Sequence, residues 1–469
     1  MAADTICALP GRGLFLAWIC VVNLSSTRMN QLLRNIFLGL AALLIIYAAL
    51  FANYLHEAGT PSFRSKIIWL AIAGAVFLVV AGLRFSIKTK SKIFAVLFSL
   101  LLVEMLLQAA AWLGVLPAVN TKLKAPFARI YWTSEGHGND VRNRFGWHYP
   151  QFDLQSPKRI AVIGDSFVEA VEVGRNQNEA ADLQRLLRAR SPEWSVLAFG
   201  THGTSPAFHL DVFDYARRHF APQEVLVLVY LGNDINESSP PLNYVPAENY
   251  IYYDLDSGGR LVLNPASATA RDQFDRGLEF SHKSWLVTLP VVLNSHCMTL
   301  QLADSLRDSL LRRRRIPQMA AADAETAAYG RVGLSLKPYA VPTDPEAQRA
   351  MSVMLAELAE LKQKCAAGQI RLRLVTIPFF PPQFYATQHG ADWSLKLGKY
   401  DFLSPDRQIA DFAQSHEIPF LSFADWLLAK KIGANEIRGL YFNDGSGHFT
   451  ERGHSLCAEA MFTTFYAQP

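Results

Sequence analysis

Four short polar segments of this sequence contain side chains that could carry out acyl transfer. They read Gly-Asp-Ser-Phe at 164–167, Gly-Thr-His-Gly at 200–203, Gly-Asn-Asp at 232–234 and Asp-Gly-Ser-Gly-His at 444–448. The first three directly follow apolar runs, and the fourth precedes the last run with helical spacing. Together they offer a hydroxyl, an imidazole, carboxylates and an amide, which are the groups that nucleophilic catalysis on an ester requires.

A serine hydroxyl becomes a useful nucleophile when a histidine, oriented by a carboxylate, accepts its proton. Ser166 can supply the hydroxyl, His448 the base, and Asp444 in the same loop the carboxylate. The negative oxygen that develops during the reaction needs preorganised N–H donors. The backbone N–H groups of Ser166 and Gly203 and the side-chain amide of Asn233 can form such an oxyanion hole.

The elements that would position these groups alternate between strand and helix. Apolar runs at 160–163, 195–199 and 224–231 end at glycines and indicate buried strands, and helical spacing appears at 179–188 and 209–219. The alternation resumes with a helix at 344–363, a strand at 370–377, a helix at 407–414, a strand at 418–421 and a helix at 451–465. This order predicts an α/β fold, a three-layer α/β/α sandwich with a mainly parallel sheet. Ligands bind such sheets at the carboxyl ends of the strands, where the polar segments lie.

In their order along the chain, the four segments resemble the SGNH (GDSL-type) hydrolase family. The resemblance covers roughly residues 143–234 and 441–461. A Gly-Asp-Ser tripeptide alone is weak evidence, whereas the four blocks in this order are specific. The resemblance implies that Ser166 is the nucleophile, that Gly203 and Asn233 complete the oxyanion hole, and that Asp444 and His448 complete the triad.

The same resemblance implies that Asp165 braces the turn before the nucleophile, but the sequence departs from the family in two places. The family usually spaces its last pair as Asp-x-x-His, and here three residues separate Asp444 from His448. Asp444 could still reach the histidine through the Gly-Ser-Gly loop, or a backbone carbonyl could orient the imidazole instead. The asparagine common before the first glycine of the second block is replaced by Ala198 or Phe199, at a supporting position. No Gly-x-Ser-x-Gly occurs, which excludes the nucleophile elbow of α/β-hydrolases.

Each candidate also has an ordinary structural interpretation. Ser166 is of a type that often caps helices, and Asn233 with Asp234 is a common turn after a strand. Only the four blocks together favour the catalytic interpretation.

The histidines need separate treatment. His454 is an alternative base, but it falls inside the last predicted helix, so we favour His448. His202 and His209 lie near the second block without a carboxylate at ligand spacing, and we predict no metal and no cofactor.

The first quarter of the chain is predicted to be a membrane region, residues 1–116. Apolar runs at about 36–52, 67–83 and 93–116 are each long enough to span a bilayer. Glu104 and Gln108 lie one helical turn apart in the third run, and we favour a polar pair that joins the helices over a functional site. A connector at 117–157 leads to a hydrolase-like domain at 158–469, with an insertion at about 236–342 that fits no alternation.

Basic residues set the expected orientation. Lys and Arg flank the first run on its amino side and fill the joint between the second and third runs, which places both in the cytoplasm. The domain after the third run then lies outside the cytoplasm, periplasmic or extracellular. A short apolar stretch at 14–22 resembles the core of a signal peptide, and its cleavage would reverse this topology. The acidic Asp4 and the missing cleavage site argue against cleavage, and Met29 is our hypothesis for the true start.

Composition and charge limit the classes of protein to which this chain can belong. The chain has 469 residues, 50% of them hydrophobic, and a formal charge of +4, which excludes a disordered chain and gives no support to nucleic-acid binding. Five scattered cysteines form no Cys-x-x-Cys motif, and a disulfide between Cys297 and Cys365 stays open.

The sequence therefore predicts a membrane-anchored serine esterase that hydrolyses O-acyl esters, chiefly O-acetyl esters, of cell-envelope or external glycans. An O-acyltransferase working with a membrane partner, a lipid-ester hydrolase and a non-catalytic carbohydrate-binding module are the alternatives. The first two share the same serine and histidine chemistry, and the third would not need it.

Overall fold

The computed structural model describes residues 26–57, 61–116, 124–243, 245–303, 306, 336–380, 396–397, 400–445 and 447–467. Its contacts divide the chain into two compact units, Met1–Ala109 and Ala110–Pro469. The signal-like stretch at 14–22 lies outside the described residues. Each unit is described by itself below.

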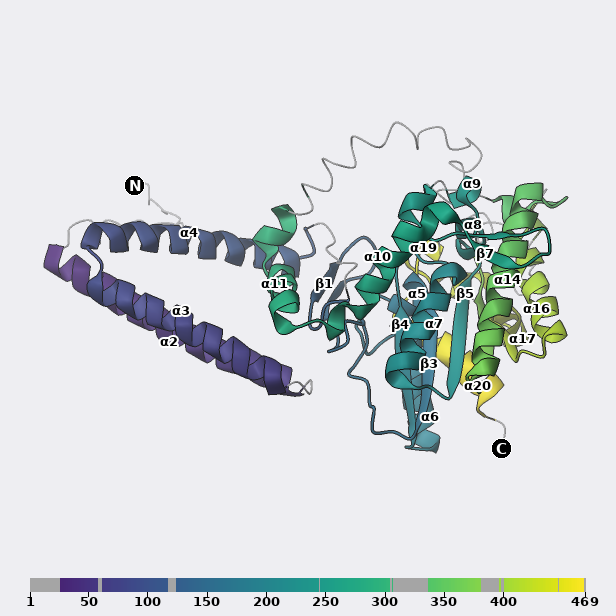
Figure 1. Ribbon diagram of the computed structural model, residues 1–469, viewed down its shortest axis with the longest axis horizontal. Helices are drawn as coiled ribbons and strands as arrows, with labels where there is room; N and C mark the ends of the chain where they lie inside the picture. The colour runs from purple at the N-terminus through teal and green to yellow at the C-terminus, as the bar shows by residue number, and fades with distance from the viewer. Residues whose placement is uncertain are drawn as a thin grey trace, which may run out of the picture. The chain divides into compact units, whose positions relative to one another are not determined.

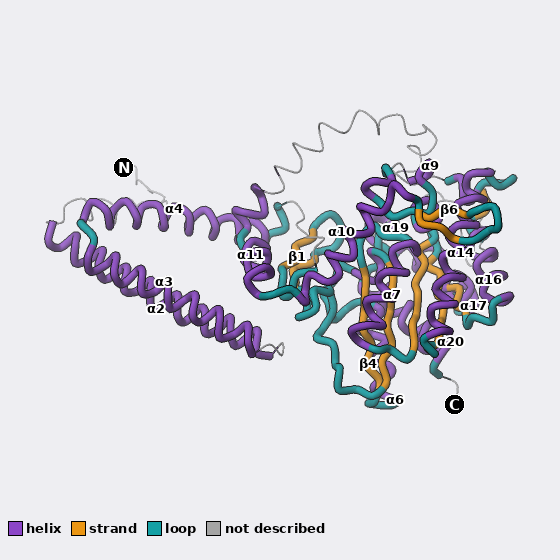
Figure 2. Tube along the Cα trace, in the orientation of Figure 1, coloured by secondary structure: helices purple, strands orange, loops and turns teal. Residues whose placement is uncertain are grey.

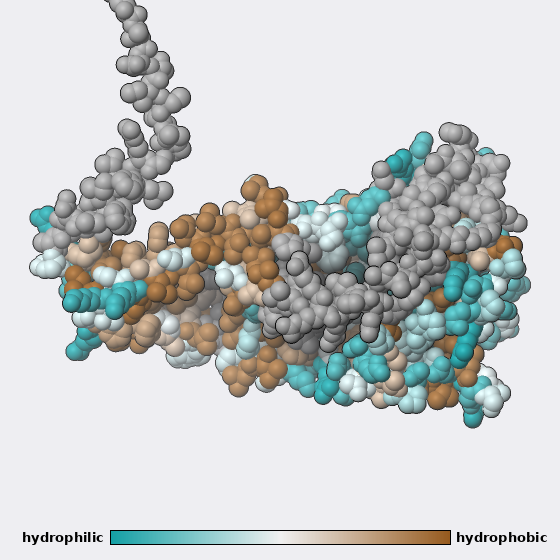
Figure 3. All heavy atoms as spheres, turned by 90° about the horizontal axis from the view of Figure 1, so that it is seen from above, coloured by the Kyte–Doolittle hydropathy of each residue, from teal (hydrophilic) through white to brown (hydrophobic). Residues whose placement is uncertain are grey.

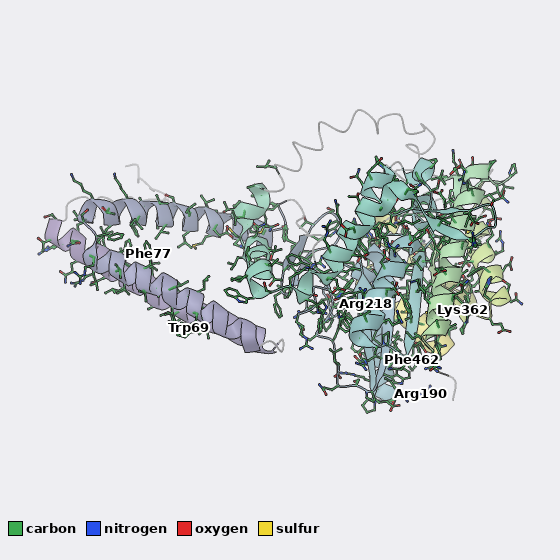
Figure 4. All side chains as sticks on the ribbon, viewed as in Figure 1. Trp69, Phe77, Arg190, Arg218, Lys362 and Phe462 are labelled. Carbon is green, nitrogen blue, oxygen red and sulfur yellow. The ribbon has the colours of Figure 1, made fainter. Side chains whose placement is uncertain are left out.

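The first unit is helical. It contains α2 (Ser26–Glu57), α3 (Pro61–Arg84) and most of α4 (Ile87–Trp112), and α2 packs along α3. Apolar side chains such as Trp69 and Phe77 of α3, labelled in Figure 4, are exposed, and hydrophobic residues cover much of the surface (Figure 3). A helix whose outer face is apolar suits a lipid environment rather than water.

Two stretches among the described residues have the length and hydropathy of a membrane span, Ser26–Ile46 and α4. The apolar stretch of α3, Ile68–Arg84, is shorter. Two of the three expected spans are therefore supported by length and composition, and the third is not shown. Gln108 donates a hydrogen bond to Glu104 over 2.7 Å, so these two polar side chains of α4 are bonded to each other.

The second unit is built on a five-stranded sheet with the order β11-β8-β5-β3-β4 (Figure 1). Its strands are β3 (Lys158–Gly164), β4 (Trp194–Gly200), β5 (Glu224–Tyr230), β8 (Arg371–Ile377) and β11 (Phe420–Ser422). Every neighbouring pair is parallel, which confirms the predicted α/β class and parallel sheet. Strand residues such as Val162 and Val227 are fully buried. Such continuous apolar strands are typical of a parallel sheet that is covered on both faces.

Helices cover both faces of this sheet (Figure 2). On one face α6 (Glu179–Arg190) packs against α20 (Glu451–Phe465), and on the other α7 (Pro206–Phe220) packs against α14 (Pro345–Ala367). The predicted helices thus form the outer layers of a three-layer sandwich. Shorter helices complete the carboxyl-terminal part: α16 (Ser404–Ser415), α17 (Phe423–Ala429), α18 (Ala434–Arg438) and α19 (Phe442–Gly445). Two-residue strands β9 (Lys396–Leu397) and β10 (Tyr400–Asp401) form a small antiparallel pair.

The segment between the membrane region and the sheet has more structure than its sequence suggested. Strands β1 (Arg129–Trp132) and β2 (Gly138–Val141) form an antiparallel hairpin. Behind the hairpin, Arg142 and Trp147 are fully buried. The predicted connector therefore contributes a hairpin and buried side chains to the second unit.

The region after β5 contains short elements where no alternation was expected. They are α8 (Asp234–Glu237), α9 (Pro240–Asn243), η1 (Ala247–Asn249), β6 (Tyr253–Leu255), β7 (Leu261–Leu263), η2 (Pro265–Ser267), α10 (Ala268–Leu278), η3 (Glu279–His282), α11 (Trp285–His296) and η5 (Lys337–Tyr339). No disulfide joins Cys297 to Cys365 in the structure, so the pairing considered from the sequence does not form.

Candidate active site

Ser166 lies at a sharp turn between β3 and a single-turn helix, α5 (Ser166–Glu169). Asp165 caps this helix, because its Oδ1 accepts a hydrogen bond of 2.9 Å from the backbone N–H of Phe167. A Cβ atom at Gly164 would collide with Val168, so the close turn requires glycine there. The turn leaves Ser166 at the carboxyl end of the sheet with only 6% of its surface exposed.

His448 lies beside this serine. Its Nε2 is 2.7 Å from Ser166 Oγ, a hydrogen-bond distance. The turn that carries His448 is held by Phe442, whose N–H donates to the His448 carbonyl over 2.8 Å. The imidazole also packs on the ring of Phe167, with centroids 5.0 Å apart. The imidazole is therefore placed where it could take a proton from the hydroxyl.

The carboxylate that binds the other imidazole nitrogen belongs to Glu135. Its Oε1 forms a short hydrogen bond with His448 Nδ1. Its Oε2 accepts from the backbone N–H of His448 over 2.9 Å and from the amide of Asn443 over 3.4 Å. Glu135 occupies the turn of the β1–β2 hairpin and is buried. It fixes the imidazole in place and would stabilise its positive charge.

Two glycines make the approach of Glu135 possible. Gly136 has a φ of +63°, which favours glycine, and a Cβ there would collide with the carbonyl of Glu172. A Cβ at Gly447 would collide with Glu135 Oε2 itself. The Gly-Ser-Gly sequence before His448 thus leaves room for a carboxylate from another part of the chain.

This geometry differs from the expectation for Asp444. The structure brings Ser166 and His448 together as predicted from the sequence, but the carboxylate at Nδ1 is Glu135. Asp444 lies in α19, and its side chain is outside the described residues. Sequence reasoning missed Glu135, which precedes the first recognised motif. The unusual spacing between Asp444 and His448 was the one signal that pointed away from Asp444.

The loop after β4 borders the serine and histidine pair. The ring of His202 lies 6.1 Å from the ring of His448, centroid to centroid, and 5.6 Å from the ring of Trp132. Gly203 follows with a φ of +67°, and a Cβ there would meet no heavy atom within 4 Å. Glycine is therefore favoured at 203 by backbone conformation and not by lack of space. The location of this loop is compatible with a backbone donor from Gly203.

Asn233 follows β5 at the same end of the sheet. Its Nδ2 donates to Glu237 over 3.2 Å. Burial raises the pKa of Glu237 to about 7 despite a hydrogen bond from Tyr250. Glu237 holds the amide of Asn233 close to the turn of the nucleophile.

Asp165 links the two strand ends. Burial raises the pKa of this carboxyl to about 6, although the N–H of Phe167, the charge of His448 and the amide of Asn233 all lower it. Those contacts place the Asn233 amide beside the residue that precedes Ser166. Asp165, expected from the sequence to brace the turn, and Asn233, expected to donate to the oxyanion, are therefore neighbours.

A buried group of charges lies beneath the loop after β4. Glu169 Oε1 accepts from Arg142 over 2.9 Å and lies 3.8 Å from Lys124 Nζ, and all three side chains are almost fully buried. Glu169 Oε2 accepts from the backbone N–H of His202 over 2.9 Å, and Lys124 donates to the carbonyl of Gly200 over 3.0 Å. Both contacts hold the loop that carries Gly203.

His454, the alternative base considered from the sequence, is held by two buried carboxylates. It is fully buried in α20, where its Nδ1 is hydrogen-bonded to Glu179 and its Nε2 lies 3.6 Å from Glu172. Burial lowers the pKa of His454, but the two carboxylates more than offset this effect and raise it to about 9. The charged imidazole ties α20 to α6 and to the segment that follows α5.

This ion-paired histidine predicts a pH-dependent stability. Because its pKa is about 9 in the folded state and 6.5 in the reference state, its stabilisation is complete below pH 6.5 and is lost as pH rises through 9. The shift corresponds to about 3 kcal/mol. We expect His454→Gln to lower the thermal unfolding midpoint of the full-length protein strongly at pH 6.5 and only slightly at pH 9.5.

Comparing wild type with the variant at each pH isolates this effect. The stability contribution of Lys124 has the opposite pH dependence, because burial lowers the pKa of this side chain to about 7. Wild type and variant share this contribution, so it cancels in the difference between them. A difference between wild type and variant that does not shrink with rising pH would contradict a charged His454.

Other histidines lie away from the serine. His209 is fully buried, and burial alone lowers its pKa to about 3, so it is a neutral core residue. Within the described residues, one group could hold a metal ion: His219, Glu279 and His282. It lies at the carboxyl end of α7, at the opposite edge of the sheet from Ser166, and Glu279 already pairs with Arg218, which is labelled in Figure 4.

Comparisons with known proteins give a fold resemblance only. No family model and no curated protein matches the chain. Among solved structures, the chain is similar to TesA, with 14% identity, a TM-score of 0.34 and coverage of 66% of this chain and 98% of that chain. It is also similar to a lipolytic protein of the G-D-S-L family from Desulfitobacterium hafniense DCB-2, with 12% identity, a TM-score of 0.30 and coverage of 66% and 99%. A third is Axe2, an acetylxylan esterase from Geobacillus stearothermophilus, with 12% identity, a TM-score of 0.32 and coverage of 67% and 96%.

Proposed function

We propose that this protein is a serine hydrolase of ester bonds, with Ser166 as nucleophile, His448 as general base and Glu135 as the carboxylate of the triad. The observation that carries the proposal is the chain of contacts from Ser166 Oγ through both nitrogens of His448 to Glu135. Nucleophile, base and orienting carboxylate are the three parts that acyl transfer to a serine requires.

The reaction follows from this geometry. Ser166 Oγ attacks the ester carbonyl while its proton passes to His448 Nε2, and the carbonyl oxygen becomes negative. The N–H groups of Ser166 and Gly203 and the amide of Asn233 are proposed to bind that oxygen. The protonated His448 then gives its proton to the departing alcohol, which leaves an acyl group on Ser166. Water activated by His448 releases the acid and restores the enzyme.

We further propose that the protein is anchored in a membrane with this site outside the cytoplasm. The two apolar helices of the first unit support the anchor. The side of the membrane is proposed from α3 as a third span and from the basic residues at the amino end of α4, which would lie in the cytoplasm. O-acetyl esters of envelope or external glycans are then the first substrates to test. A lipid ester, or transfer of the acyl group to a sugar hydroxyl, would use the same acyl-enzyme.

The test combines turnover with covalent labelling of the full-length protein in detergent micelles. We expect hydrolysis of p-nitrophenyl acetate and, with a fluorophosphonate, a mass increase on the peptide that contains Ser166. Ser166→Ala should abolish the labelling and lower turnover by several orders of magnitude. Labelling of another residue, or equal turnover by a folded Ser166→Ala variant, would refute the assignment.

Hydrolysis and transfer are separated by a second measurement. The acyl-enzyme is formed with p-nitrophenyl acetate in the presence and absence of a glycan acceptor. Acetate release at the same rate with and without the acceptor supports the hydrolase. Movement of acetyl to the glycan much faster than to water would replace it by a transferase.

A further inference from the structure

Helix α11 is apolar on its exposed side as well as on its buried side. Thr288, Leu289 and Val292 are buried against the second unit. On the outward side, Leu286 is 66% exposed and Leu293 is 49% exposed. A helix at a protein–water surface normally presents charged and polar residues outward. The composition of α11 therefore indicates that something other than water covers its outer side.

The position of α11 is fixed by the hairpin that carries Glu135. Ser295 of α11 accepts a hydrogen bond of 2.9 Å from the backbone N–H of Arg129, the first residue of β1. The next residue, His296, is hydrogen-bonded to the carbonyl of Phe127 over 2.9 Å. These contacts orient the helix, so its exposed apolar side is not the result of loose attachment.

The same hairpin also holds the segment that follows α4. Thr133, just after β1, donates to the carbonyl of Leu116 over 2.9 Å. Residues from Ala110 onward belong to the same compact unit as the sheet. In this segment Trp112 is 75% exposed and Val115 is 70% exposed. The carboxyl end of a proposed span and the apolar helix are thus attached to the two ends of one short hairpin.

We propose that α11 lies in the interfacial layer of the bilayer from which α4 emerges, with Leu286, Val287 and Leu293 among the lipid acyl chains. The attachment of α11 and of the exposed apolar segment after α4 to the same hairpin selects the bilayer as the occupant over a second protein. Trp112 is of the type enriched at the membrane–water boundary. Lys283, exposed directly before α11, would meet the lipid headgroups. This inference rests on the proposed membrane anchor.

The consequence for the site is direct. The hairpin between these two attachments carries Glu135 at its turn, and Glu135 positions His448. Docking of α11 would hold the catalytic carboxylate within a short distance of the membrane surface. The ester substrate is then one that is presented at that surface, on a lipid or on a glycan close to it.

The test measures lipid contact at single positions of the full-length protein in nanodiscs of phosphatidylethanolamine and phosphatidylglycerol. Leu286→Cys, Leu293→Cys, Leu100→Cys and Val262→Cys are each labelled with the fluorophore NBD in a background without other reactive cysteines. Leu100 is an exposed residue of α4, and Val262 is an exposed apolar residue of β7 that matches Leu293 in exposure. Hydrolysis of p-nitrophenyl acetate by each labelled protein confirms that it is folded.

Quenching by lipids with brominated acyl chains gives the answer. We expect quenching of at least twofold at 286, 293 and 100 and none at 262. Quenching at 100 without quenching at 286 and 293 would overturn the docking of α11 and leave the anchor intact. Lack of quenching at all four positions would overturn the membrane anchor and the docking with it, whereas esterase activity would be unaffected.

Discussion

We expect Glu135→Gln to lower kcat for ester hydrolysis by about 10⁴-fold, the loss typical when the carboxylate of a serine triad is replaced by an amide. The amide has nearly the shape of the carboxylate but can donate a proton to His448 Nδ1. The imidazole is then held in the tautomer that carries its proton on Nε2, where it cannot accept the proton of Ser166. Glutamine also cannot stabilise the positive imidazolium that forms during attack.

Asp444→Asn is the matched control, since it likewise replaces a carboxylate by its amide, at the residue that the sequence predicted for this role. We expect it to change kcat by less than about threefold, because the orienting position is already occupied by Glu135. Steady-state kinetics with p-nitrophenyl acetate measure both variants, and equal thermal unfolding midpoints exclude misfolding. A large loss in Asp444→Asn with a small loss in Glu135→Gln would return the role to Asp444.

The sheet was predictable because local pattern and tertiary packing agree there. The runs at 160–163 and 224–231 are continuous and apolar, and both form parallel strands buried on two faces. The strand ends then meet at one edge by the geometry of a parallel sheet, which brings Ser166 next to Asn233 and their loops next to His448.

Glu135 could not be found in the same way. It precedes Ser166 by 31 residues, in a segment without hydrophobic period, and its location depends on a two-strand pairing and on two glycines. Gly136 and Gly447 have meaning only once the hairpin turn and the histidine loop are in contact. A pattern read from one strand or one loop contains no information on such a contact.

The buried charges under the second block were equally invisible in the sequence. Lys124 and Arg142 lie in the predicted connector, where basic residues usually indicate solvent. In the structure both are buried with Glu169, and Lys124 also lies over the ring of Trp147, 4.2 Å from its centroid. Their cost of burial is offset because the carboxylate and the backbone carbonyls accept their hydrogen bonds.

This cluster gives the largest expected change in stability. Burial raises the pKa of Glu169, but the positive charges of Lys124 and Arg142 outweigh this effect and lower the pKa to about 2. The contribution of Glu169 to folding is therefore present above pH 4.5 and is lost as pH falls through 2. Glu169→Gln leaves the buried Arg142 without its anion, and breaking a buried ion pair from one side costs about 3–5 kcal/mol. At neutral pH we expect the thermal unfolding midpoint of the full-length protein to fall by about 5–10 °C.

The control for this prediction is the exposed ion pair between Lys158 and Glu193, whose side chains are 46% and 41% exposed. Glu193→Gln removes the same charge from a pair of the same type in water, so we expect no measurable change in its midpoint. Equal midpoints for Glu169→Gln and Glu193→Gln would show that the buried cluster is not a net support of the fold. If the midpoint falls for Glu169→Gln alone, kcat is then measured at a temperature well below that midpoint. A lower kcat there would show that the cluster also holds the loop of Gly203 in the position that catalysis requires. That second effect is expected because Glu169 accepts the N–H of His202, one residue before the proposed oxyanion donor.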